Sequence, residues 1–115
     1  MDEFMGILKA LSDETRIKIV NILLSHDYCV GALTKRLDIS EAAVSQHLQV
    51  LRKAGVVTGE KRGYYTHYRV NRDLLREASD KMKEMSGKTR ECEGGCSKHT
   101  TGEHRYCEMK KDDNA

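Results

Sequence analysis

The sequence predicts a mainly α-helical domain with a single β-hairpin, followed by a cysteine-rich C-terminal tail. Apolar residues recur at helical spacing over most of the first 54 residues, and between residues 56 and 70 the pattern changes to two short runs typical of strands. Three of the four cysteines lie after residue 91. A chain of 115 residues suits one compact domain, so we expect this domain at residues 1–87 and a flexible tail at residues 88–115.

Two helices are predicted before the middle of the chain. Phe4, Leu8 and Leu11 form one apolar stripe of a first helix over residues 4–11. Ser12-Asp13 then offers a side-chain cap for a second helix, which ends at about Ser25. Apolar residues surround most of this second helix, so it is predicted to be the central buried one; they are Ile17, Val20, Leu23 and Leu24.

The middle of the chain predicts a helix-turn-helix. A short helix over residues 30–37 is followed by the tight connection Asp38-Ile39 and by a longer helix from Glu41 to about Ala54. Ser40 is a suitable N-cap for the longer helix, because its hydroxyl can accept a hydrogen bond from a free N–H of the first turn. Gly55 supplies the left-handed residue that commonly ends a helix.

A hairpin and a last helix complete the predicted domain. Val56–Thr58 and Tyr64–Val70 are predicted to be strands, joined by a charged turn with a basic tip at residues 59–63. A helix over residues 72–86 carries its apolar side chains on one face and ends at Gly87. A helix-turn-helix followed by such a hairpin has the outline of a winged helix.

The excess positive charge lies in one stretch. Residues 41–70 carry five Lys or Arg against two Asp or Glu, whereas the net charge of the whole chain is +2. A localised basic patch is typical of a protein that binds a polyanion such as nucleic acid. Aromatic residues make up 5% of the chain, which leaves little for stacking on single-stranded bases and favours duplex DNA.

The outer face of the helix at 41–54 is the predicted reading surface. Val44, Leu48 and Leu51 share its apolar face, and Val50 widens that face, whereas the opposite face is small or amide-bearing. The major groove admits a helix whose early side chains reach base edges. Lys61 and Arg62 at the hairpin tip suit phosphates, while His47 fits a packing role and a phosphate contact equally well. The predicted DNA contacts are Ser45, Gln46, His47, Gln49, Lys53, Lys61, Arg62 and Tyr64.

These motifs resemble one known family. The segments Leu8–Arg16 and Ala43–Val57, together with the wing from Lys61 to Val70, resemble the ArsR/SmtB family of metal-sensing repressors. The resemblance covers about residues 4–86. It implies a homodimer that binds operator DNA and is released when an inducer binds.

Dimerisation follows from two apolar stripes and from the resemblance. The stripes on residues 4–11 and 72–86 have no obvious partner inside so small a fold, and pairing them across a two-fold axis would bury them. In the resembling family the first and last helices form the dimer interface. The predicted interface residues are Phe4, Leu8, Leu74, Ala78, Met82 and Met85.

The metal sites that the resemblance implies are incomplete in this sequence. One family site uses a Cys-Val-Cys pair, which here reads Cys29-Val30-Gly31, so the second thiol is absent. Another uses Asp and His ligands on the last helix. The corresponding residues are not usable ligands; they are Arg72, Leu74, Met85 and Lys88.

The tail offers a replacement site. Its potential ligands follow the spacing Cys92-x3-Cys96-x2-His99-x4-His104-x2-Cys107. Thiolates select soft ions; three of them suit trivalent arsenic, which binds as a three-coordinate pyramid, whereas His and Cys together suit zinc or cadmium. A Cys92–Cys96 disulfide that acts as a redox switch is a further possibility. The predicted metal ligands are Cys29, Cys92, Cys96 and Cys107.

The sequence therefore predicts a DNA-binding repressor that a thiophilic metal or metalloid releases from its operator, with As(III) favoured over Cd(II) or Zn(II). An enzyme is not expected, because no nucleophilic triad, phosphate loop or carboxylate pair is evident. The acidic N-terminus lacks an export signal, so a cytoplasmic protein without membrane contact is expected. Two alternatives stay open. One is a winged-helix regulator that responds to redox or to no ligand, and the other is a metal-binding protein whose winged domain serves protein contacts.

Overall fold

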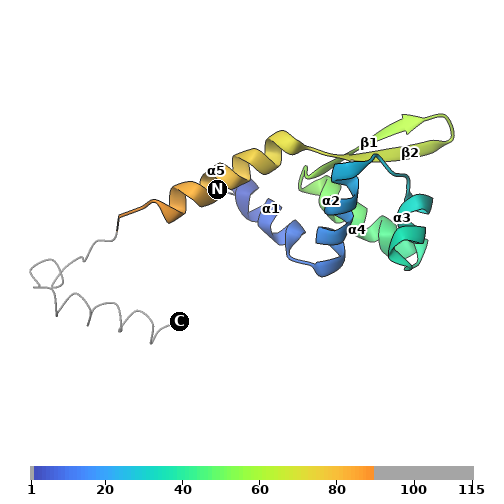
Figure 1. The fold of residues 1–115 in the computed structure, drawn as a ribbon, viewed down its shortest axis with the longest axis horizontal. Coiled ribbons are helices and arrows are strands. Elements are labelled where there is room, and N and C mark those ends of the chain that lie inside the picture. The colour runs from blue at the N-terminus through green and yellow to red at the C-terminus, as the bar shows by residue number, and fades with distance from the viewer. Residues whose placement is uncertain (1, 90–115) are drawn as a thin grey trace, which may run out of the picture. The chain divides into compact units, whose positions relative to one another are not determined.

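The computed structural model describes residues 2–89, which form five helices and a two-stranded antiparallel sheet (Figure 1). Their bounds are α1 Asp2–Leu11, α2 Glu14–Ser25, α3 Val30–Leu37, α4 Glu41–Lys53, β1 Val57–Arg62, β2 Tyr65–Val70 and α5 Arg72–Ser86. Contacts divide the chain into residues 1–83 and residues 84–115, and only the last turn of α5 and three following residues of the second part are described. No helix within the described range is long and apolar enough to cross a membrane.

The caps that the sequence predicts are present. The Asp13 carboxylate accepts a hydrogen bond from the Arg16 N–H at 3.1 Å, and the Ser40 hydroxyl accepts one from the Ala43 N–H at 3.1 Å. Gly55 has φ +82°, a left-handed conformation that a residue with a Cβ rarely adopts, and it ends the helical run after α4. Asp38 also adopts the left-handed conformation and ends α3. These local signals explain why the predicted bounds of α3 and α4 agree closely with the structure.

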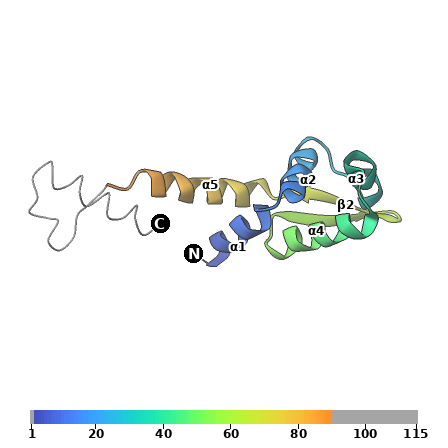
Figure 2. The same cartoon turned by 90° about the horizontal axis from the view of Figure 1, so that it is seen from below.

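A single core joins the helices to the base of the hairpin. Figures 1 and 2 show α4 beside β1 and α2 beside β2, which brings the hairpin against both helices. The side chains with the least exposed area come from all of these elements: Ile19, Leu33, Val44, Leu48, Leu51, Val56 and Val57. The hairpin is therefore fixed at its base, while its far end extends beyond the helices (Figure 1).

Three details of the predicted elements are wrong. The predicted turn at residues 59–63 is instead mostly strand, because Gly59–Arg62 pair with Tyr65–Tyr68, and the chain turns at Gly63-Tyr64. Charged residues are tolerated here because these strand positions are exposed to solvent. Ile17 and Val50 were expected on apolar faces, yet each is 40% exposed, since the core contains no element opposite them.

Candidate nucleic-acid interface

The exposed face of α4 is polar and is fixed from behind by the core. Val44, Leu48 and Leu51 are buried, which orients the helix so that its other side faces solvent. Four of the residues predicted to contact DNA lie exposed on that side: Ser45, Gln46, Gln49 and Lys53. A helix held in this way can present its amide and hydroxyl groups to base edges without losing its packing.

A groove of about 480 Å³ runs between α4 and β2. Its lining residues are Ser45, Leu48, Gln49, Arg52, Lys53 and Tyr68. Three of these belong to the residues predicted to bind DNA, so the structure brings the reading face of α4 and the hairpin to one concave surface.

Arg52 and Tyr68 are groove residues that the sequence analysis did not select. A signal for Arg52 was available, because it follows Gln49 by three positions and therefore lies on the same side of the helix. Tyr68 required knowledge of the strand register, because its side depends on how the two strands pair. Both side chains are polar at one end and contribute to the same concave surface as Lys53.

The two basic residues predicted at the hairpin tip point to opposite sides of the sheet. Successive strand residues alternate between faces, and Lys61 and Arg62 are both in β1. The pairing Gly59↔Tyr68 places Lys61 on the face of Tyr68, which borders the groove. Arg62 lies on the other face, where it meets the segment between α2 and α3.

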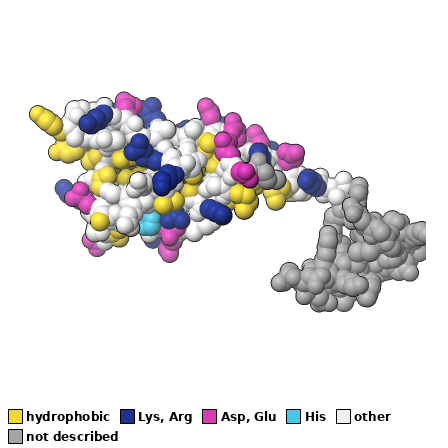
Figure 3. All heavy atoms as spheres, turned by 180° about the vertical axis from the view of Figure 1, so that it is seen from behind, with side chains coloured by type: hydrophobic (Ala, Val, Ile, Leu, Met, Phe, Trp, Pro, Cys, Tyr) yellow, Lys and Arg dark blue, Asp and Glu magenta, His cyan; other side chains and the backbone are white. Residues whose placement is uncertain are grey.

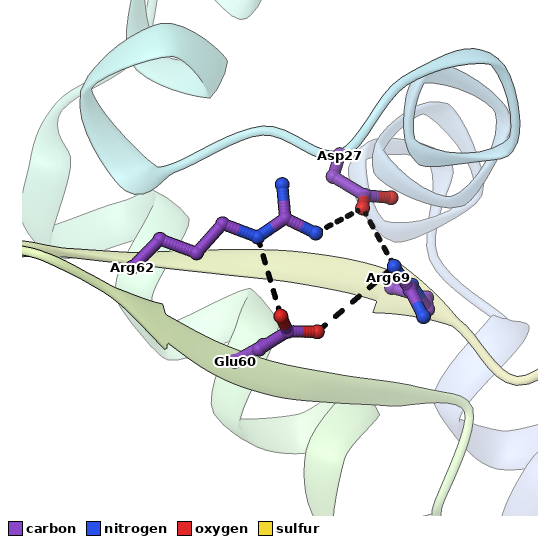
Figure 4. A network of polar contacts seen from close by, with 4 residues as sticks. All are labelled: Asp27, Glu60, Arg62 and Arg69. Atoms are coloured by element: carbon purple, nitrogen blue, oxygen red, sulfur yellow. Dashed lines mark hydrogen bonds and ion pairs between the residues drawn. The ribbon is translucent and has the colours of Figure 1, made fainter.

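On that second face, a network of ion pairs connects the hairpin to this segment (Figure 4). Arg62 Nη2 donates to Asp27 Oδ2 at 2.9 Å, and Arg69 Nη2 donates to the same oxygen at 3.1 Å. Glu60 lies 3.4 Å from Arg62 Nε and 3.9 Å from Arg69 Nη2. The hydrogen bond from Arg69, followed by that from Arg62, lowers the pKa of Asp27, and the bond to Asp27 raises the pKa of Arg62.

The cations of the groove lack such partners. Among the described residues, the structure records no hydrogen bond or ion pair for the charged groups of Arg52, Lys53 and Lys61. These groups are therefore available to an anionic ligand, whereas Arg62 already has two carboxylate partners. Tyr64 lies at the turn and is 98% exposed, so its side chain is also unobstructed.

His47 lies on the flank of α4 that faces α2. Its Nδ1 is 3.4 Å from Arg16 Nη1 and 3.9 Å from Asp13 Oδ2, and its side chain is 25% exposed. Arg16 also donates from Nε to the Ala10 carbonyl at 2.6 Å, so the same guanidinium contacts the end of α1. The packing role considered for His47 fits this position, which links α4 to the junction of α1 and α2.

The described residues do not provide a complete metal site. No group of three or more His, Cys, Asp or Glu side chains is arranged there to bind a metal ion. Cys29 is a free, partly buried thiol directly before α3, and a Cβ placed on Gly31 would lie 4.0 Å from its Sγ. Neither metal site of the resembling family therefore fits this part of the chain. The predicted ligands Cys92, Cys96 and Cys107 lie outside the described residues.

The predicted dimer residues divide into two groups. Phe4 and Ala78 are buried within the protomer, where α1 and α5 line a common small cavity, so the expectation that these stripes lack an internal partner is wrong for both. Leu8 and Leu74 pack partly against the core. Met82 and Met85 are 55% and 58% exposed, and Figure 3 shows hydrophobic side chains at the surface along α5.

Comparison with known proteins gives a consistent result. Residues 13–58 match the profile of the family described as "Bacterial regulatory protein, arsR family". The chain is 31% identical over 77 residues to the transcriptional repressor SdpR of Bacillus subtilis, which covers 67% of this chain and 86% of that protein.

Two further relatives carry metal names. The arsenical resistance operon repressor of Escherichia coli is 42% identical over 67 residues, covering 56% of each chain. The cadmium resistance regulatory protein CadC of Listeria innocua is 44% identical over 64 residues, covering 55% of this chain and 54% of that protein. The chain thus aligns with only about half the length of these two relatives.

Solved structures show the same fold. An ArsR-like transcriptional regulator from Rhodococcus sp. RHA1 superposes with a TM-score of 0.71 at 25% identity, covering 96% of this chain and 92% of that chain. A homodimeric winged helix-turn-helix DNA-binding domain from Mycobacterium bovis superposes with a TM-score of 0.63 at 23% identity, covering 74% and 80%. The winged helix-turn-helix fold predicted from the sequence is therefore confirmed.

Proposed function

The chain belongs to the ArsR family of bacterial regulatory proteins, and from this premise we propose that it is a homodimeric transcriptional repressor that a thiophilic metal or metalloid releases from operator DNA. The observation that carries DNA binding is the shared surface of α4 and the hairpin. There, exposed hydroxyl and amide groups lie beside cations without carboxylate partners.

Two roles divide this surface. Ser45, Gln46 and Gln49 read base edges in the major groove, because Gln can pair bidentately with adenine and Ser bonds either bases or phosphates. Phosphates of one strand then lie along the groove, where Arg52, Lys53 and Lys61 neutralise them and the Tyr68 hydroxyl adds a donor. The exposed Tyr64 contacts the duplex at the end of the wing.

The inducer is proposed from the chemistry of the donor set. Cys92, Cys96 and Cys107 supply three thiolates within sixteen residues, with Cys29 as a further thiol. Three thiolates favour As(III) over Cd(II) or Zn(II). The relatives named for arsenical and cadmium resistance support a metal or metalloid as the class of inducer.

Gel shifts with a duplex from the promoter region upstream of the protein's own gene test DNA binding. Gln46→Ala should weaken specific binding by about 1–3 kcal/mol and relax sequence preference. Asn21→Ala, which removes an exposed amide from α2, is the matched control and should bind as wild type does. If the folded Gln46→Ala protein keeps both affinity and sequence preference, α4 does not read the DNA.

A further inference from the structure

We propose that Asp27 withholds the wing residue Arg62 from DNA in the free protein, so that DNA phosphate must displace the Asp27 carboxylate from this guanidinium. The inference rests on the proposed function and deepens it. Asp27 contacts no DNA in this account; it is a positioning residue that acts through Arg62.

The geometry places one carboxylate between the hairpin and the helices. Asp27 lies in the segment between α2 and α3, and its Oδ2 accepts from Arg62 at 2.9 Å and from Arg69 at 3.1 Å (Figure 4). Its side chain is 25% exposed, against 41% for Arg62, so the pair lies at the surface. Both bonds keep the carboxylate ionised and fix its orientation.

Arg62 is the arginine that DNA can recruit. It pairs with Tyr65 directly beside the turn at Gly63-Tyr64, whereas Arg69 pairs with Thr58 near the base of the hairpin. The long side chain of Arg62 can therefore swing toward a duplex at the end of the wing. Arg69, closer to the core, stays to hold Asp27 in place.

The hairpin does not depend on Asp27 for its position. The Tyr68 N–H donates to the Tyr28 carbonyl at 2.9 Å, which joins β2 to the same segment through the backbone. Val57 and Val70 at the base are buried in the core. Removing the carboxylate should therefore release the Arg62 side chain while the wing itself stays where it is.

The exchange is energetically feasible in both directions. Partly exposed ion pairs contribute little to stability because water screens them, whereas Arg binds phosphate through two parallel hydrogen bonds. A phosphate close to the wing can thus displace Asp27, but each displacement removes part of the binding free energy. Without the carboxylate, Arg62 is free before DNA arrives.

Asp27→Asn tests the inference, because the amide keeps the shape and loses the charge. In titrations of the promoter duplex at several salt concentrations, this variant should bind about two- to fivefold more tightly, the range that one exposed ion pair accounts for. The slope of log affinity against log salt should also steepen by about 0.9, the effect of one added phosphate contact. A non-specific duplex of equal length should show the same gain, since phosphates carry no sequence information.

Glu60→Gln is the matched control. It removes the same unit of charge beside the same arginines, but its contacts with them are longer, at 3.4 and 3.9 Å, and it lies on the wing itself. It should give a smaller gain than Asp27→Asn. In an Arg62→Ala background, the gain from Asp27→Asn should fall to the level of this control.

Three results would overturn the inference: an Asp27→Asn protein that binds like wild type or more weakly, an equal gain from Glu60→Gln, and a full gain in the Arg62→Ala background. Circular dichroism of each variant verifies that it is folded. A wild-type protein that binds no duplex at low salt contradicts the proposed function as well. Normal wild-type binding combined with any of the three results contradicts this inference alone.

Discussion

Arg52 and Arg62 have the same side chain but opposite surroundings. Arg62 has two carboxylate partners, whereas Arg52 lines the groove beside Lys53 with no recorded partner among the described residues. An unpaired guanidinium in a concave surface is the simplest phosphate ligand that this fold offers. The difference gives Arg52 a larger expected part in DNA binding than its position near the end of α4 indicates.

Replacing Arg52 with Ala should therefore reduce the salt dependence of DNA binding. The slope of log affinity against log salt should become shallower by about 0.9, because one phosphate contact is lost. Lys18→Ala, which removes a cation that pairs with Glu14 on α2 at 3.3 Å, should leave the slope unchanged. Equal slopes for Arg52→Ala and wild type would remove Arg52 from the interface.

Asp27 also makes a pH-dependent contribution to folding. Its pKa is lowered in the folded chain by the hydrogen bonds from Arg69 and Arg62, so the stabilisation is fully present above the ordinary carboxyl value of about 3.9 and is lost as the pH falls through the lower folded value. Asp27→Asn should lower the free energy of unfolding by at most about 1 kcal/mol at pH 7, since the pair is partly exposed. Urea denaturation of both proteins between pH 2.5 and pH 7, as a range of about four units around that value, should show the difference shrinking toward acid; a constant difference would contradict the assignment.

At the scale of elements, α5 has an inner and an outer side. Ala78 packs toward α1, whereas Met82 and Met85 remain more than half exposed. Together with Met5 on α1, which is 47% exposed, they leave thioether side chains at the surface of the two helices proposed to form the dimer. Exposed apolar side chains on neighbouring helices favour a protein–protein contact.

Met82→Glu should therefore dissociate the dimer. A charge without a partner in an apolar interface is costly, so sedimentation should show a monomer whose helix content is unchanged. Arg76→Glu, on the opposite side of α5, is the control and should remain dimeric. A dimeric Met82→Glu protein would place the interface on other elements.

The close approach of the two strands depends on a missing side chain. A Cβ placed on Gly59 would lie 3.0 Å from Thr66 Cγ2 and 3.2 Å from Tyr68 Cε1. Two neighbours would have to move, and Tyr68 is restrained by its backbone bond to Tyr28. Gly59→Ala should therefore lower the free energy of unfolding by about 1 kcal/mol or more and displace the Tyr68 ring. Urea denaturation measures the first effect, and an unchanged or increased stability would contradict the argument.

The elements differ in how far the sequence predicts them. The helices α3 and α4 were placed within a residue or so, because Ser40 and Gly55 fix their ends through local chemistry. The turn of the hairpin was misplaced, because Gly59 and Gly63 look alike in sequence and only Gly63 has a positive φ. The exposure of Ile17 and Val50 depends on which elements lie opposite them, and a single helix does not contain that information.

The candidate site shows the same limit. The polar face of α4 follows from a helical wheel, so Ser45, Gln46 and Gln49 were found without a structure. The opposite orientations of Lys61 and Arg62 depend on the strand pairing, and the ion pair with Asp27 joins residues 35 positions apart. Neither feature has a local signature.

At the scale of the whole molecule, the proposed sensor and the proposed DNA surface occupy different parts of the chain. The residues of the groove lie within 45–68, whereas three of the four proposed thiolate ligands lie beyond residue 91. The described domain also lacks a complete metal site of its own. Binding of DNA and binding of metal should therefore be separable by truncation.

A chain that ends after Gly87 should bind the promoter duplex as the full chain does but no longer leave it when arsenite, cadmium or zinc is added. In the full chain, Cys92→Ser and Cys96→Ser should abolish the response, and Cys29→Ser and Cys107→Ser should show which of them supplies the third thiolate. Affinity for the metal should increase with pH toward the thiol pKa, about 8.5 when unperturbed. Release of the truncated protein by metal would return attention to Cys29.

The alternation of β1 also constrains how the wing can change in length. Adding one residue to β1 between Gly59 and the turn would exchange the sides on which Lys61 and Arg62 project, which would turn the tethered arginine toward the groove and the free lysine toward Asp27. Adding two residues would lengthen the wing and leave each charge on its own side. Among related wings that keep both the groove cation and the tether, we therefore expect lengths before the turn to differ by even numbers of residues.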